Sequence, residues 1–142
     1  MSKKVGKSKN KRKPLMAGAS EREFSEDKEF VISFKHLDRQ QGQSLSDWES
    51  LGILSQAIET LRGYCGETLH SRLDNKFTIY GKFPPSDKTD FTHPKHVPED
   101  AEWARIHVNG KVCIVGHVVR NIFNVVFLDK DHRFWISEKK HT

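Results

Sequence analysis

Basic and titratable side chains are concentrated in the last third of the chain, between Trp103 and Trp135. They are Arg105, His107, Lys111, His117, Arg120, His132 and Arg133. Metal-free cleavage of RNA needs a base for the 2′-hydroxyl, an acid for the leaving 5′-oxygen, and cations that stabilise the charge developing on phosphorus. Histidine transfers protons near neutral pH, and arginine donates paired hydrogen bonds to phosphate.

Two roles therefore divide these residues. The expected catalytic residues are His107, His117, His132, Arg105 and Arg120. Lys111 and Arg133 are expected to contact nucleic acid. The same pattern also fits the ordinary solvated face of a half-buried sheet. Asp129 and Asp131, which precede His132, fit a capped turn as well as a site.

The strands that carry these residues can be placed from their alternation. Trp103 to Val108 and Lys111 to Val118 both alternate between polar and apolar residues, which is typical of strands. A three-residue turn with Gly110 in the left-handed conformation would pair His107 with Lys111. A two-residue turn at 120–121 would set His117 opposite Asn124 and Val118 opposite Phe123.

This register predicts two different faces of one sheet. The polar face would carry Arg105, His107, Lys111, Cys113, His117 and Asn124. The apolar face, which should receive a helix, would carry Ile106, Val112, Ile114, Val118, Phe123, Val125 and Phe127.

The rest of the chain supplies the other elements of a small domain. We expect a strand over 29–37 and a helix that begins at a Ser46–Glu49 capping box and ends near residue 65. Its apolar stripe would be Leu51, Leu54, Ile58 and Leu61. A short helix over 67–73, a strand over 76–83 and a long proline-rich loop over 84–100 follow. The predicted fold is α+β: an antiparallel sheet of about four to five strands with one or two helices packed on one face.

The ends of the chain differ from this domain in composition. Residues 1–27 are expected to be a disordered basic arm, 28–136 the domain and 137–142 a tail. Most of the net charge of +5 comes from the arm, whose cations Lys3, Lys4, Lys11, Arg12 and Lys13 could bind nucleic acid. No apolar run is long enough to span a membrane. With only two cysteines, we expect a reduced, cytoplasmic protein without a cofactor.

Several other residues are weaker candidates. His93 and His96 have a spacing that can bind zinc, but Pro94 between them fits a plain loop. Cys113 lies among basic residues, yet no base for a nucleophile is evident beside it. Arg62, His70 and Arg72 could border the cleft or lie on a solvated helix face. Gly6-Lys7-Ser8 lacks the first glycine and the preceding strand of a P-loop.

The chain resembles a group of small, largely uncharacterised bacterial proteins. The likeness covers about residues 30 to 135, from Val31-Ile32-Ser33-Phe34-Lys35 through Gly116-His117-Val118 to the ending Leu128-Asp129-Lys130-Asp131-His132. The most specific part is this Leu-Asp-x-x-His ending.

A looser resemblance is to RelE/ParE-type toxins, which share the order strand, helix, helix and then antiparallel strands. The ribonuclease members of that group bind mRNA on the ribosome and cut it without a metal. The resemblance implies RNA or the ribosome, and an antitoxin, as partners. The acidic Asp129-Lys130-Asp131 departs from the basic last strand of such toxins.

Two functions follow from the sequence. The first is a metal-independent endoribonuclease of RelE-like type, acting as the toxin of a bacterial toxin–antitoxin or phage-defence pair. The alternative is a non-catalytic adaptor that binds nucleic acid or another protein.

Overall fold

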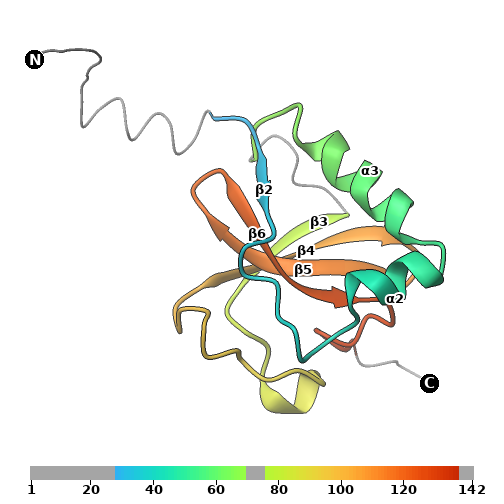
Figure 1. The fold of residues 1–142 in the computed structure, drawn as a ribbon. Coiled ribbons are helices and arrows are strands. Elements are labelled where there is room, and N and C mark those ends of the chain that lie inside the picture. The colour runs from blue at the N-terminus through green and yellow to red at the C-terminus, as the bar shows by residue number, and fades with distance from the viewer. Residues whose placement is uncertain (1–27, 70–75, 138–142) are drawn as a thin grey trace, which may run out of the picture.

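The chain folds into one five-stranded sheet with two helices on one face (Figure 1). This computed structural model describes residues 28–69 and 76–137. The sheet order is β2-β6-β5-β4-β3, formed by Val31–Ser33, Ile122–Asp129, Val112–Val119, Glu102–Asn109 and Phe77–Gly81. The β6–β5, β5–β4 and β4–β3 pairings are antiparallel, and β2 pairs with β6 in parallel. The α+β prediction is confirmed.

The helices begin earlier and are shorter than predicted. α2 spans Leu45–Ser50 and α3 spans Leu54–Tyr64, with Gly52 between them at φ 75°. The capping box is formed by Ser44 and Asp47, not by Ser46 and Glu49. Because Gly52 interrupts the helix, the predicted single stripe does not form. The sequence did correctly place the helix end at residue 64–65.

The helix face that packs on the sheet also differs from the predicted stripe. Ala57, Leu61 and Tyr64 are buried, whereas Leu51 and Ile58 are exposed. These buried side chains join the apolar side of the strands in a first core, which includes Phe30, Trp48, Phe77, Ile106, Ile114, Val118, Phe123 and Val125. Burial of these apolar side chains is the main contribution to the stability of the packing of the helices on the sheet.

Two other sequence assignments need correction in this half of the chain. The predicted strand over 29–37 is reduced to three residues, because the chain turns after Ser33. Residues 67–69 are not helical, and the rest of the predicted helix over 67–73 lies largely outside the described residues. The predicted strand over 76–83 is present as β3.

The register of the last three strands is close to the predicted one but contains two bulges. The turn between β4 and β5 is Gly110-Lys111, with Asn109 opposite Val112 and His107 opposite Cys113. The expected pairing of His107 with Lys111 is therefore wrong, and the extra residue Val108 restores the alternation. The turn at 120–121 and the pairing of His117 with Asn124 are confirmed.

A second bulge moves Phe127 to the opposite face from the predicted one. Gly116 pairs with Val125 and Val115 pairs with Phe127, so Val126 is the extra residue on β6. Phe127 consequently packs in a second core with Trp103 and Phe134.

This second core covers much of the face that was predicted to be polar and open. Phe91 and Val97 come from the connection between β3 and β4, which contains the short 3₁₀ helix η3 (Ser86–Lys88), and Phe134 comes from the segment after β6. Figure 1 shows the connection, in yellow to orange, leaving the sheet on the side away from α3. Among the described residues no helix has the length and hydropathy to cross a membrane.

Candidate functional site

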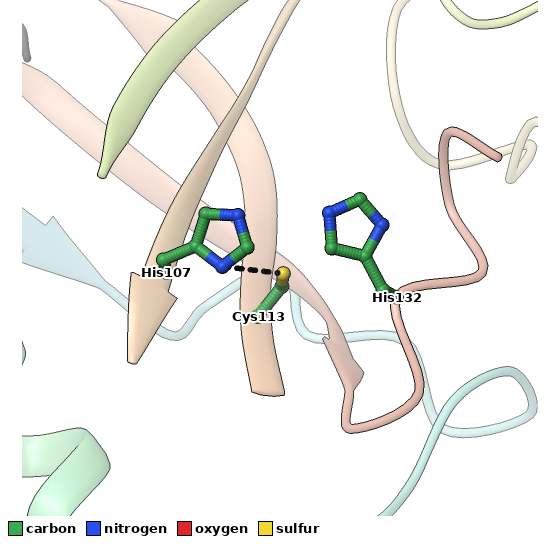
Figure 2. A group of neighbouring side chains, drawn as sticks. All are labelled: His107, Cys113 and His132. Atoms are coloured by element: carbon green, nitrogen blue, oxygen red, sulfur yellow. Dashed lines mark hydrogen bonds between the residues drawn. The ribbon is translucent and has the colours of Figure 1, made fainter. Parts of the chain in front are cut away.

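Two histidines and a cysteine from three different segments meet beside the β4–β5 hairpin. His107 lies on β4, Cys113 on β5 and His132 in the turn after β6. The Nδ1 atom of His107 is 3.5 Å from the Sγ atom of Cys113. The two imidazole rings have centroids 5.1 Å apart, and Figure 2 shows the sulfur between them. The sheet alternation explains the first contact, since the two residues face each other across the ladder.

The turn after β6 is held in place by the carboxylate of Asp129. That side chain is buried and accepts hydrogen bonds from the backbone N–H groups of Arg133 and Phe134, each at 2.9 Å. Within this turn His132 has a φ of 60°, a left-handed conformation that is uncommon for a residue other than glycine. The Leu-Asp-x-x-His ending therefore has a physical explanation: Leu128 packs in the core, Asp129 fixes the turn, and His132 is presented to the site.

Arg105 occupies the same face of β4, two residues before His107. Its Nη2 donates to Thr78 Oγ1 at 2.7 Å, and its guanidinium lies 5.7 Å from the centre of the Tyr80 ring. The buried Nε atom has no hydrogen-bond partner among the described residues. A guanidinium held in this way keeps part of its donor capacity for another group.

The surroundings of His107 are electropositive. Burial lowers the pKa of His107 to about 4, and the nearby charges of Arg105, His132 and Lys76 act in the same direction. The imidazole is consequently neutral at pH 7 and offers a lone pair. Cations that disfavour a proton on His107 also favour the approach of an anion such as phosphate.

The pKa values of the two acidic groups next to His107 and His132, the Cys113 thiol and the Asp129 carboxyl, are both raised. Burial raises the pKa of the Cys113 thiol to about 12, and the Asp129 carboxylate adds to this shift. Burial also raises the pKa of Asp129, although the hydrogen bonds from the backbone of Arg133 and Phe134 oppose it. Without a bound cation, Cys113 is therefore a thiol at neutral pH.

A hollow of about 420 Å³ lies next to His107. Its walls are formed by Gln56, Lys76, His107, Val108, Asn109 and Gly110. This hollow gives His107 a route of access from the hairpin side of the sheet.

The sequence-predicted catalytic residues separate into two groups. The structure brings together Arg105, His107 and His132. His117 is opposite Trp103, four residues from His107 along β4, which corresponds to about 13 Å at 3.3 Å per residue. Arg120 is exposed in the β5–β6 turn with φ 59°.

The predicted nucleic-acid contacts are also spread out. Lys111 is exposed in the β4–β5 turn, next to Gly110 at the edge of the hollow. Arg133 lies beside His132, but its Nε makes an ion pair with Asp90 at 2.6 Å. Lys3, Lys4, Lys11, Arg12 and Lys13 lie outside the described residues.

His117 belongs to a separate group of histidines. Its ring is 5.8 Å from the ring of His36 and 6.1 Å from that of Trp103, and its Nε2 is buried without a described partner. His96 Nε2 donates to the backbone oxygen of His36 at 2.8 Å, and His93 contacts Trp103. His93 and His96 make separate contacts, and the metal-compatible group within the described ranges is the one at His107.

The remaining sequence candidates lie away from this group or outside the described residues. Arg62 is exposed on α3 and pairs with Glu59. His70 and Arg72 fall in the segment 70–75, which is not described.

Sequence reasoning missed three contributors to the site. Cys113 was placed on the correct face, but its contact with His107 depends on the bulge at Val108. Thr78 and Tyr80 come from β3, and no local signal indicated that β3 would lie beside β4.

Comparison with known proteins adds no family to these observations: no family model matches the chain, and neither does a curated protein or a solved structure.

Proposed function

We propose that this chain is a metal-independent endoribonuclease of RelE-like type, with His107, His132 and Arg105 as its catalytic residues. The observation that carries the proposal is the meeting of two imidazoles, with ring centroids 5.1 Å apart, in electropositive surroundings where one of them, His107, also borders a hollow. The order of elements supports it as well: a strand, two helices and then four strands. That order is the one on which the resemblance to RelE/ParE-type toxins rests.

The reaction would be an internal transfer at phosphorus. The neutral His107 accepts the proton of the 2′-hydroxyl as the 2′-oxygen forms a bond to phosphorus. The bond from phosphorus to the 5′-oxygen breaks, and His132 gives that oxygen a proton. The products are a 2′,3′-cyclic phosphate and a 5′-hydroxyl. Arg105 stabilises the charge on the phosphoryl oxygens in the transition state.

Two features of the chain supply the RNA contact in this proposal. Lys76 lines the hollow, and Lys111 is exposed in the β4–β5 turn at its edge. The basic arm adds sequence-independent, salt-sensitive affinity for phosphates. His117 and Arg120 are left out of the catalytic set, because neither is next to His107.

The direct test is cleavage of RNA, free and on bacterial ribosomes, in the presence of EDTA. Wild type should cleave, and His107→Ala and His132→Ala should each lose about 10²–10⁴-fold in rate. The matched control is His96→Ala, which makes the same change at an exposed position outside the site and should retain activity. Circular dichroism establishes that each variant is folded.

Two further results would decide against the proposal. An RNA mobility shift without cleavage by wild type would favour the adaptor function. A toxin should also inhibit bacterial growth on expression, and unimpaired growth with wild type together with inactivity on ribosomes would exclude this role.

A further inference from the structure

His107, Cys113 and His132 have the donor atoms and spacing of a metal site. A ring nitrogen of each histidine and the Sγ atom of Cys113 all lie within 4.8 Å of one another. The three side chains converge from two strands and one turn, with the sulfur between the rings (Figure 2). Three converging donors of this kind are not needed for the proton transfers proposed above, because Cys113 takes no part in them.

The separation of two of the donor atoms fits tetrahedral coordination. Zinc binds imidazole nitrogen at about 2.0–2.1 Å and thiolate sulfur at about 2.3 Å, so tetrahedral geometry places the two ligand atoms about 3.5 Å apart. The His107 Nδ1 to Cys113 Sγ distance is 3.5 Å. Two of the three ligands are therefore already at the required distance, and a ring nitrogen of the third, His132, lies within 4.8 Å of both.

The chemistry of the donors selects the kind of metal. One thiolate and two imidazoles are soft to borderline ligands, which bind zinc or cobalt well and magnesium or calcium poorly. The buried thiol gives up its proton to solvent when it binds the ion, because a coordinating thiol is deprotonated. Asp129, across the β5–β6 ladder from Cys113, supplies a further negative charge.

We infer that His107, Cys113 and His132 bind a zinc ion, and that the bound ion inhibits the enzyme. The inhibitory part rests on the proposed ribonuclease function. A zinc ion would occupy the imidazole lone pairs that His107 and His132 need for proton transfer, so the protein would be active only when the site is free of metal.

Cobalt is the probe for the metal site itself. Full-length protein, kept reduced and freed of metal with EDTA that is then removed, is titrated with Co²⁺ in an absorbance assay. We expect a thiolate-to-cobalt charge-transfer band and the visible bands of tetrahedral cobalt, saturating at one equivalent and abolished by zinc. Cys113→Ser should remove the charge-transfer band. Cys65→Ser, which changes the other free cysteine, should keep it.

A charge-transfer band that is lost in Cys65→Ser and kept in Cys113→Ser would overturn the proposed metal site. So would a wild-type protein without the charge-transfer band, or a Cys113→Ser protein that keeps it. If Cys113→Ser does not fold, His132→Ala replaces it, and that variant should bind cobalt at least tenfold more weakly.

Ribonuclease assays then test the inhibition separately. Cleavage by wild type should fall at least tenfold when zinc replaces EDTA, and the ratio of the two rates should be closer to one for Cys113→Ser. A charge-transfer band without cleavage in either medium would exclude the ribonuclease and leave the metal site in place. Cleavage without the band would exclude the metal site and leave the ribonuclease. Cleavage that rises with zinc would overturn the inhibition.

Discussion

His132 is the residue whose backbone shows most plainly that its position is imposed by its surroundings. A left-handed φ of 60° costs a non-glycine residue about 1 kcal/mol, and such strain persists only where neighbouring contacts hold it. Here the carboxylate of Asp129 holds the turn through the backbone of Arg133 and Phe134. Strain that is retained at a histidine facing another histidine is consistent with a functional position.

Asp129→Ala should destabilise the protein and disturb the site together. The substitution leaves two backbone N–H groups without their acceptor, at about 1–3 kcal/mol for each one that stays buried. We therefore expect a loss of at least about 2 kcal/mol in the free energy of unfolding by urea. The control is Asp131→Ala, an exposed residue whose partner is Lys130, and it should change stability by less than about 0.5 kcal/mol. Equal stability of the two variants would contradict the role given to Asp129.

Single residues were predictable from the sequence where their role is local. Leu128, Asp129 and His132 were singled out, and the alternation placed Arg105, His107 and Cys113 on one face. Cys113 could not be paired with His107 in advance, because that pairing depends on where one extra residue is inserted in β4. The position of His117, opposite Trp103 and four residues from His107 along β4, follows from the same register.

At the scale of elements, hydrophobic alternation identified the strands and turn residues located the hairpins. It could not predict the bulges at Val108 and Val126, which shift the alternation by one residue. The second bulge constrains Gly116, which pairs with Val125 beside the extra residue Val126. A Cβ atom added there would lie 2.0 Å from the backbone oxygen of Asn124. The glycine is therefore required by the close approach of the two strands.

Substitution of two glycines by alanine should have opposite effects on stability. Gly116→Ala forces the backbone of β5 and β6 apart and should cost about 1–3 kcal/mol. Gly63→Ala, on the exposed side of α3 with no atom within 4 Å of the added Cβ, should gain about 0.5–1 kcal/mol. Thermal and urea unfolding measure both. A Gly116→Ala protein as stable as wild type would show that the strands are not in this register.

At the scale of the whole molecule, the sheet is covered on both faces. The helical side was predictable in part: the apolar face of the strands and Leu61 on α3 follow from their spacing, whereas Leu51 and Ile58 of the predicted stripe are exposed. The other side was not: Phe91, Val97 and Phe134 lie in loops, and only the tertiary fold shows that they pack on Trp103 and Phe127. Part of the face predicted to be an open cationic surface is therefore buried in the second core, and the candidate site lies only at its hairpin end.

Coverage of this face makes the fold sensitive to acid through His117. That side chain is 3% exposed, and burial lowers its pKa, with His36, His96 and His93 adding positive charge nearby. In the unfolded chain a histidine has a pKa of about 6.5. Below that pH the unfolded state binds a proton that the folded state does not, so the free energy of unfolding falls as pH drops toward the folded pKa. Above about pH 6.5 the contribution is constant.

The His117→Gln variant measures this effect, because glutamine does not titrate. Between about pH 7.5 and pH 5 the variant should lose less stability than wild type, whatever its stability at the higher pH. His107 also has a lowered pKa and adds a loss in the same direction to both proteins, so the difference between their curves is the quantity to compare. The exposed His96→Gln variant should keep more of the wild-type slope. Parallel curves for wild type and His117→Gln would mean that protonation of His117 does not oppose folding, and that the second core opens to water around it.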